Sequence, residues 1–167
     1  MINMLPRLFI MCGLPASGKS TFARQFIRDN DIRYVSRDEI RFFMVKEDEE
    51  YFSHEKEVFK KFAGTIAQTL IDGFDVIADA THLNRISRDK LIRAIDQYTT
   101  EYTITYIVLE TSLETCMKRN ALREGRARVP DSVMKSMAEN WEDITISEKS
   151  YDRYEGTLYL SGVMQYE

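Results

Sequence analysis

Residues 13–20 combine glycines, a lysine and a hydroxyl residue at a spacing suited to phosphate binding. They read Gly-Leu-Pro-Ala-Ser-Gly-Lys-Ser, which fits the pattern G-x-x-x-x-G-K-S. Backbone N–H groups of such a loop surround phosphate oxygens. A lysine at its end reaches the β- and γ-phosphates, and the hydroxyl that follows coordinates Mg²⁺. The loop therefore predicts a site for ATP and Mg²⁺ formed by Gly13, Pro15, Ala16, Ser17, Gly18, Lys19, Ser20 and Thr21.

The segments on either side of this loop support the prediction. Residues 8–12 are apolar throughout, as in a strand buried on both faces. Residues 19–28 place apolar side chains on one face of a helix. The alternative is an ordinary glycine turn with a solvated lysine, and the strand-loop-helix context disfavours it. We expect Lys19 to be exposed when no nucleotide is bound, and essential for the chemistry.

Two further polar clusters follow predicted strands. Ser36-Arg37-Asp38 follows residues 34–35, and Asp79-Ala80-Thr81-His82 follows residues 75–78. The carboxyl ends of parallel strands meet at one edge of a sheet, so we expect both clusters to share a cleft with the phosphate loop. Ser36 and Glu39 form a predicted capping box at the start of a helix.

That capped helix places Asp38 and Arg41 on one face, three residues apart in its first turn. Asp38 could instead only complement the helix dipole, and Arg41 could be a solvated surface arginine. Asp79 could simply end its strand and hold a turn. His54 and His82 have no partner at metal-ligand spacing; His54 is expected to be solvated, and His82 could line the acceptor side.

The remaining pattern alternates helices and strands. Helices are expected at 55–71, at 88–97, from a capping box at Thr111–Glu114 to about 122, and from Pro130 onward; strands are expected at 102–109 and 158–160. This alternation predicts an α/β fold with a doubly wound parallel sheet, as one domain over residues 1–167. The apolar face of the last helix is a core surface or a base-stacking platform; it comprises Val133, Met134, Met137 and Trp141.

The segment between the two last predicted helices, residues 123–129, is rich in arginine. Arg123, Arg126 and Arg128 lie in it against the single acidic residue Glu124. We expect a mobile lid that folds over bound phosphates, because guanidinium groups bind phosphate oxygens bidentately. The alternative is a basic loop solvated in water.

Composition narrows the possible functions. A net charge of −4 and a pI of about 5.4 argue against non-specific coating of nucleic acid, so any such contact must be local. Cys12 and Cys116 show no metal spacing and suit a reducing cytoplasm, with Cys12 in the core. No apolar run is long enough to cross a membrane. GTP switches usually carry a guanine-reading Asn-Lys-x-Asp segment, which this sequence lacks, and motor ATPases usually need more than 167 residues. The chain therefore suits a small kinase better than either class.

Several segments, in the same order along the chain, resemble the phage-type polynucleotide 5′-kinase domain. They also resemble the wider group of small P-loop kinases that includes zeta-type toxins and seryl-tRNA kinases. The similarity covers residues 7 to about 145. Its segments are residues 13–20, Thr21-Phe22-Ala23-Arg24, Ser36-Arg37-Asp38-Glu39-Ile40-Arg41, Asp79-Ala80-Thr81, Lys118-Arg119-Asn120 and Val129-Pro130. The resemblance implies a P-loop kinase fold with an arginine-rich lid, ATP with Mg²⁺, and a hydroxyl acceptor.

The resemblance also implies roles for individual residues. Asp38 stands where the family's Asp accepts the proton of the attacking hydroxyl, and Arg41 where an arginine grips the acceptor's phosphate. Arg123, or failing that Arg126, takes the place of the arginine that meets the transition-state charge. Two features depart from the phage-type pattern: the lid is about one residue longer, and Ala80 stands where that pattern has Asp. Asp79, one residue earlier, is expected to serve Mg²⁺ through water or to brace the loop.

Three functions remain open on the sequence. The first is phosphorylation of the 5′-hydroxyl end of RNA or DNA by a cytoplasmic enzyme that does not bind membranes. The second is a kinase for a small molecule, a nucleotide sugar or a charged tRNA. The third is a non-catalytic ATP-binding module whose lid signals to a partner. The spacing of Asp38, Arg41 and the arginine lid favours the first.

Overall fold

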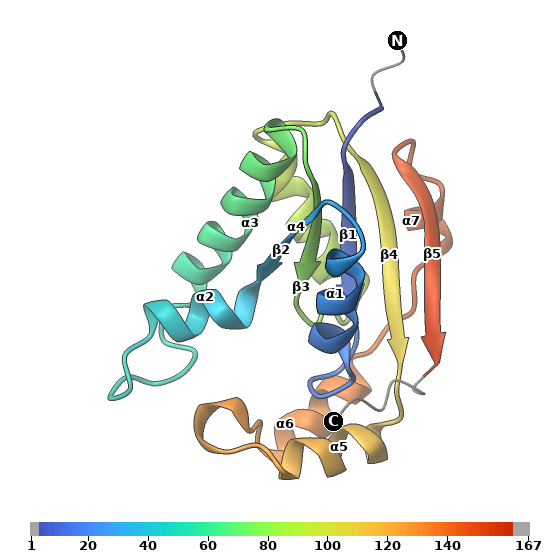
Figure 1. Ribbon diagram of the computed structural model, residues 1–167. Helices are drawn as coiled ribbons and strands as arrows, with labels where there is room; N and C mark the ends of the chain where they lie inside the picture. Colours follow the sequence, from blue (N-terminus) through green and yellow to red (C-terminus); the bar gives the residue numbers. More distant parts are fainter. Residues whose placement is uncertain (1–3, 162–167) are drawn as a thin grey trace.

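The computed structural model describes residues 4–161, and its centre is a sheet of five parallel strands in the order β2-β3-β1-β4-β5 (Figure 1). The strands are β1 (Arg7–Cys12), β2 (Ile32–Ser36), β3 (Asp75–Asp79), β4 (Thr103–Glu110) and β5 (Tyr154–Ser161). The helices are α1 (Lys19–Arg28), α2 (Arg37–Met44), α3 (Glu55–Ile71), α4 (Arg85–Asp96), α5 (Leu113–Ala121), η1 (Gly125–Ala127), α6 (Asp131–Glu139) and α7 (Ile146–Lys149). The predicted doubly wound α/β sheet is confirmed.

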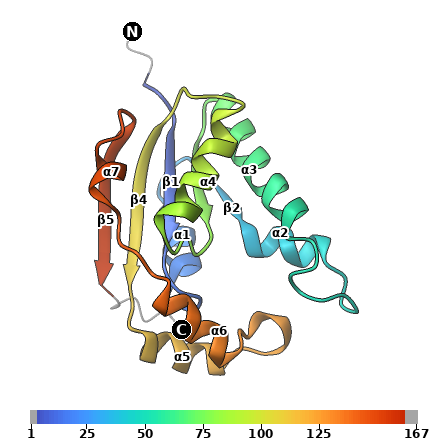
Figure 2. The ribbon, with the colours of Figure 1, turned by 180° about the vertical axis from the view of Figure 1, so that it is seen from behind.

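Helices cover both faces of the sheet, because the central strand β1 is apolar on both. Leu8, Ile10 and Cys12 of β1 pack into a core with apolar side chains of α3 and α4. Phe9 and Met11, which point the other way, pack against α1. The two views from opposite sides show α1 over one face and α4 over the other (Figures 1 and 2). A third cluster joins the phosphate loop to α5 and α6 beyond the carboxyl ends of the strands.

Both cysteines are free and buried, and Cys12 lies in the core as predicted. Burial raises the pKa of the Cys12 thiol to about 12, so it stays protonated at neutral pH. Within residues 4–161, no helix is both long and apolar enough to cross a membrane.

Several element starts differ from the sequence prediction. Helix α4 begins at Arg85 rather than residue 88, because Asn84 caps it in a box with Ser87. Helix α5 is capped by Ser112 rather than Thr111, because the Thr111 hydroxyl is used elsewhere: it donates to the Ser17 carbonyl at 2.8 Å. Ser36 accepts from the Glu39 N–H at 3.2 Å, which is one half of the predicted capping box.

The last part of the described chain holds the other differences. Pro130 is the N-cap of α6 rather than its first residue. Strand β5 begins at Tyr154, four residues before the predicted segment, and α7 was not predicted. Met134 is buried in the third cluster, Trp141 packs against the core, and Met137 packs against the third cluster and also lines the cleft described below.

Candidate active site

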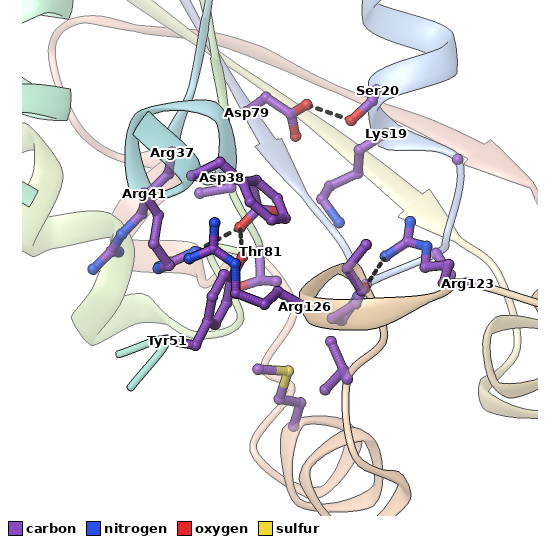
Figure 3. A pocket seen from close by; sticks show the side chains of 18 of the residues that line it. Lys19, Ser20, Arg37, Asp38, Arg41, Tyr51, Asp79, Thr81, Arg123 and Arg126 are labelled. Carbon is purple, nitrogen blue, oxygen red and sulfur yellow. Dashed lines mark hydrogen bonds and ion pairs between the residues drawn. The ribbon is translucent and has the colours of Figure 1, made fainter. Parts of the chain in front are cut away.

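The carboxyl ends of β1, β2 and β3 open into one cleft of about 450 Å³. The phosphate loop and the start of α1 form one wall, and α2 with the segment before α3 forms the wall opposite. The lid and the residues just after β3 complete it (Figure 3). The three polar clusters of the sequence therefore converge, as predicted from the parallel sheet.

The phosphate loop holds its shape through positive backbone angles and tight packing. Gly18, the N-cap of α1, has φ 101°, a conformation that favours glycine. Ala16 also has a positive φ, 63°. A Cβ on Gly13 would lie 2.8 Å from the Ser17 hydroxyl and 3.2 Å from Leu109 Cβ, so close packing excludes a side chain there.

The eight predicted loop residues divide into two groups. Six line the cleft: Pro15, Ala16, Gly18, Lys19, Ser20 and Thr21. Gly13 and Ser17 are buried supports instead. The Gly13 N–H donates to the Thr81 carbonyl at 2.9 Å, which ties the loop to the segment after β3. The Ser17 hydroxyl is buried without a hydrogen-bond partner among the described residues.

Lys19 is folded into its own loop, so the expectation that it is exposed was wrong. Its ammonium donates to the carbonyls of Gly13 at 3.0 Å and Leu14 at 2.7 Å. Burial lowers the pKa of Lys19, and the negative charges of Asp79 and Asp38 oppose that shift. These two carbonyl oxygens satisfy the buried cation.

Ser20 and Asp79 form an oxygen pair suited to Mg²⁺. The Ser20 hydroxyl donates to Asp79 Oδ2 at 2.8 Å, and the Tyr34 hydroxyl donates to the same oxygen at 2.5 Å. Within residues 4–161, no group of three or more His, Cys, Asp or Glu side chains could hold a metal. A small oxygen set still fits Mg²⁺, which usually keeps several waters and binds one or two carboxylates plus substrate phosphates. Ser20 and Asp79 would hold the ion.

Asp38 and Arg41 are joined directly on the opposite wall. Arg41 Nη1 donates to Asp38 Oδ1 at 2.5 Å. The Arg41 side chain is only 8% exposed, which excludes the alternative of a solvated surface arginine, whereas the Asp38 side chain is 70% exposed. Asp38 therefore combines access to the cleft with a fixed neighbouring cation.

Glu55 at the start of α3 holds this pair from behind. Its carboxylate accepts from Arg41 Nε at 2.6 Å and Nη2 at 3.0 Å, and from Arg37 Nη2 at 3.0 Å. Burial alone lowers the pKa of Arg41, but the hydrogen bonds to Glu55 and Tyr51 and the charge of Glu55 raise it well above its usual range. Arg37 also lines the cleft, and its Nε is buried without a partner among the described residues. Sequence analysis gave no role to Glu55 or Arg37.

The lid places its arginines in different directions. Arg123 is exposed, lines the cleft on the phosphate-loop side, and donates to the Ala127 carbonyl at 3.5 Å (Figure 3). Arg126 crosses to the other wall and donates to the carbonyls of Val45 at 2.9 Å and Lys46 at 3.4 Å. Arg128 is exposed and lies outside the set of residues that line the cleft.

His82 belongs to the core rather than to the cleft. Its ring is buried, stacks on Phe62, and bonds through Nδ1 to the Met11 carbonyl at 2.6 Å. Burial lowers the pKa of His82 to about 4. The suggestion that His82 lines the acceptor side therefore does not hold. His54 is the N-cap residue of α3, where its ring contacts the Glu49 carboxylate.

The cleft can thus place a nucleotide's phosphates on one wall and a hydroxyl acceptor on the other. Lys19, the N-terminus of α1 and Arg123 supply positive charge on the phosphate side. Asp38 supplies an accessible carboxylate on the acceptor side. This is the division of parts that phosphoryl transfer to a hydroxyl requires.

Comparisons with known proteins agree with this geometry. The profile of a family described as an AAA domain matches residues 8–144. The L-seryl-tRNA(Sec) kinase of Methanococcus maripaludis is 27% identical over 137 residues, which make up 81% of this chain and 52% of that protein. The chain therefore spans about half of the length of this curated relative.

Two solved structures are also similar. A chain of the Pnkp1/Rnl/Hen1 RNA repair complex is 25% identical, with a TM-score of 0.71 over 91% of this chain and 48% of that chain. Kti12 of Chaetomium thermophilum, in complex with ADP-AlF3, is 17% identical, with a TM-score of 0.69 over 92% of this chain and 88% of that chain. The second likeness concerns the fold alone.

Proposed function

This chain belongs to the AAA-domain family of P-loop kinases, and from that membership we propose that it transfers the γ-phosphate of ATP to the 5′-hydroxyl end of a polynucleotide. Kinase-type phosphotransfer follows from the family and its kinase relatives. The polynucleotide acceptor is the further step, and it is supported by the arrangement of the acceptor wall and by the similarity to a chain of an RNA repair complex.

One observation carries the proposal: Asp38 and Arg41 stand across the same cleft from Lys19 and Ser20. In the proposed reaction, Asp38 accepts the proton of the acceptor hydroxyl, whose oxygen attacks the γ-phosphorus. The bond to the β–γ bridging oxygen breaks and ADP leaves. Lys19 and a lid arginine stabilise the charge that develops on the transferred group.

We propose that Mg²⁺ accompanies the ATP, held by Ser20 and Asp79. The ion would neutralise phosphate charge during transfer. Tyr34 positions Asp79 through its hydroxyl, and Asp79 in turn raises the pKa of Tyr34 beyond the effect of burial. Tyr34 therefore stays protonated and keeps donating to the carboxylate.

Three arginines stand on the acceptor side of the cleft although the chain as a whole is acidic. Arg37, Arg41 and Arg126 all line the cleft, against a net charge of −4 overall. An enzyme that grips only the end of a strand needs few phosphate contacts, so this local charge suffices. We propose that it acts in the cytoplasm, where its two unpaired cysteines stay reduced.

A panel of acceptors with labelled ATP tests the proposal. The panel holds a 5′-hydroxyl oligoribonucleotide, the matching oligodeoxyribonucleotide, seryl-tRNA, hexoses and nucleotide sugars. We expect label on the 5′ ends and little on the other acceptors. Transfer to a sugar alone, or to no acceptor at all, would contradict the proposal.

A second candidate is a kinase that acts on the serine hydroxyl of a charged tRNA. The observation in its favour is the 27% identity to an L-seryl-tRNA(Sec) kinase over 137 residues. The same panel separates the two, because label would then appear on seryl-tRNA and be released by mild base together with the amino acid.

A further inference from the structure

Three aromatic side chains line the acceptor end of the cleft. Phe42 lies near the end of α2, and Tyr51 and Phe52 lie in the segment before α3. Ring centroids are 5.6 Å apart between Phe42 and Tyr51, and 4.9 Å apart between Tyr51 and Phe52. Phe42 is 40% exposed and Phe52 47% exposed, so the cluster offers apolar ring surface to the cleft. We call Phe42, Tyr51 and Phe52 the aromatic subsite.

Two arginines lie over these rings. The guanidinium carbon of Arg41 is 5.1 Å from the Tyr51 ring centroid and 5.2 Å from that of Phe52. That of Arg126 is 5.1 Å from the Phe42 centroid. All three distances suit cation–π contact. The subsite therefore combines ring faces with fixed positive charge, within the same cleft as Asp38 (Figure 3).

We propose that the aromatic subsite stacks the base of the acceptor's 5′-terminal nucleotide, with Phe52 as the principal contact. This inference rests on the proposed 5′-kinase function and names the part of the acceptor that is recognised. Bases stack on aromatic side chains whatever their identity, because every base has a π-face. Phe52 is the most exposed of the three rings and so has the most surface to offer.

The chemistry of the subsite suits a base better than a free sugar. A sugar needs many hydrogen bonds, but the three rings carry a single hydroxyl, that of Tyr51. That hydroxyl already lies 3.5 Å from Asp38 Oδ1. Arg41 and Arg126 beside the rings can meet the phosphate that follows a terminal nucleoside. A planar base next to a phosphate matches this combination.

The acidic run at residues 47–50, just before Tyr51, is consistent with contact at the strand end only. Glu47, Asp48 and Glu50 are exposed and would repel phosphates further along a bound strand. We therefore expect affinity to depend on the terminal nucleotide and to change little with strand length. Stacking without hydrogen-bond readout also predicts little preference among the four terminal bases.

Two measurements test the aromatic subsite. The first is steady-state kinetics on two oligonucleotides that differ only in whether the 5′-terminal nucleotide carries a base or is abasic, both with a free 5′-hydroxyl. We expect the abasic end to have a KM about tenfold higher or more, as loss of one stacked base predicts, with kcat much less affected. The second is the fluorescence of a 5′-terminal 2-aminopurine, which stacking should quench when the protein is added without ATP.

Phe52→Ala should remove most of the quenching and bring the two KM values together, and Phe42→Ala should do so in part. The matched control is Phe43→Ala, because Phe43 neighbours Phe42 on α2 but is 91% exposed and is not among the residues that line the cleft. Phe43→Ala should keep both the quenching and the KM ratio of the wild type. Phe52 is half exposed, so its replacement leaves the core intact.

The outcomes separate this inference from the proposed function. Transfer to base-bearing and abasic ends with equal KM would overturn the aromatic subsite and leave the 5′-kinase proposal standing. Quenching that depends on Phe52, without transfer to any oligonucleotide, would overturn the proposed function and support base binding at the subsite. Absence of quenching in the wild type, or equal loss in Phe43→Ala, would overturn the subsite directly.

Discussion

Glu55 at the start of α3 holds the guanidinium of Arg41 through two hydrogen bonds, at 2.6 Å to Nε and 3.0 Å to Nη2. The remaining terminal nitrogen, Nη1, donates to Asp38 at 2.5 Å. Arg41 is thus fixed between the carboxylate of Glu55, whose side chain is 33% exposed, and that of Asp38, which faces the cleft. Because the Arg41 side chain is nearly buried, its orientation, and with it that of Asp38, depends on Glu55.

We predict that Glu55→Gln raises the KM for the acceptor while the affinity for ATP stays the same. Glutamine keeps one acceptor oxygen but loses the charge and one of the two bonds to Arg41, which should also lower the free energy of unfolding by about 1–3 kcal/mol. Acceptor kinetics, nucleotide titration and urea unfolding measure the three quantities. Glu57→Gln is the matched control, since Glu57 is exposed in the same first turn. Equal effects of the two variants would show that only the helix dipole is involved.

Asp38→Asn should lower kcat by about 10²–10⁴-fold with nearly unchanged ATP affinity. The amide keeps the size of the side chain and can still accept from Arg41, but it cannot take up a proton, and general base catalysis is typically worth that factor. Single-turnover kinetics with saturating ATP measures the chemical step. A parallel loss of ATP binding and rate would place Asp38 in the metal site instead of the acceptor wall.

Lys19→Met should abolish transfer and also reduce stability. The ammonium donates to the carbonyls of Gly13 and Leu14, so methionine leaves buried carbonyl oxygens without that partner. We expect unfolding to become easier by about 1–3 kcal/mol, which a thermal melt detects. A variant that keeps more than about a tenth of wild-type kcat would contradict the role of Lys19 in the transition state, because such contacts are worth orders of magnitude.

The sequence predicted the strands and the polar clusters that follow them because each is a local feature of the chain. Parallel pairing of the strands then brings the clusters to one edge of the sheet. An apolar run such as residues 8–12, followed by a glycine loop, indicates both a buried strand and what lies at its end. Prediction was weaker at α4, where the cap Asn84 pairs with Ser87 rather than with Glu or Gln. It was also weaker at β5, an edge strand whose residues show no regular alternation of burial. That residues 1–167 act as one domain stays a prediction.

The parts of the site that escaped prediction depend on tertiary contacts. Glu55 is 14 positions from Arg41 in the chain, and Tyr34 is 45 positions from Asp79. Neither spacing carries a periodic signal. Lys19 was placed wrongly because a sequence does not show that the loop's own carbonyls enclose the ammonium. The aromatic residues at 42, 51 and 52 belong to no motif, and only the fold brings their rings together.

His82 should make stability depend on pH in the mildly acidic range. Its folded-state pKa is about 4 against an ordinary 6.5, so between these values the unfolded chain binds the additional proton. The contribution of His82 to the free energy of unfolding is fully present above pH 6.5. It decreases by about 1.4 kcal/mol per pH unit as the pH falls toward 4. Urea unfolding at pH 7 and pH 5 should therefore differ by about 2 kcal/mol on this account.

His82→Asn should flatten that pH dependence. Asparagine tolerates the positive φ of 41° at this position better than most residues and does not titrate. Carboxylates also contribute to acid unfolding. The informative quantity is therefore the difference between the wild type and the variant in the slope of the free energy of unfolding against pH. An identical slope in both proteins would mean that His82 is protonated or released from the Met11 carbonyl without cost.

The lid arginines should differ in which kinetic constant they control. Arg123 lies on the phosphate-loop side of the cleft, whereas Arg126 is bound to the carbonyls of Val45 and Lys46 and covers Phe42. We therefore predict that Arg123→Ala lowers kcat by about 10³-fold or more, as loss of an arginine that meets the developing γ-phosphoryl charge does. Arg126→Ala should act mainly by raising the KM for the acceptor.

Conservative variants and proteolysis test this assignment of Arg123 independently. Lysine cannot copy the two parallel bonds of a guanidinium, so Arg123→Lys should fail nearly as badly as Arg123→Ala. Arg128→Ala is the matched control, because Arg128 is an exposed lid arginine outside the set that lines the cleft. The lid should also order over bound nucleotide, so ATP with Mg²⁺ should protect it from trypsin. Near-wild-type rates for all three alanine variants, with equal cleavage in both states, would remove the lid from catalysis and favour a nucleotide-binding module.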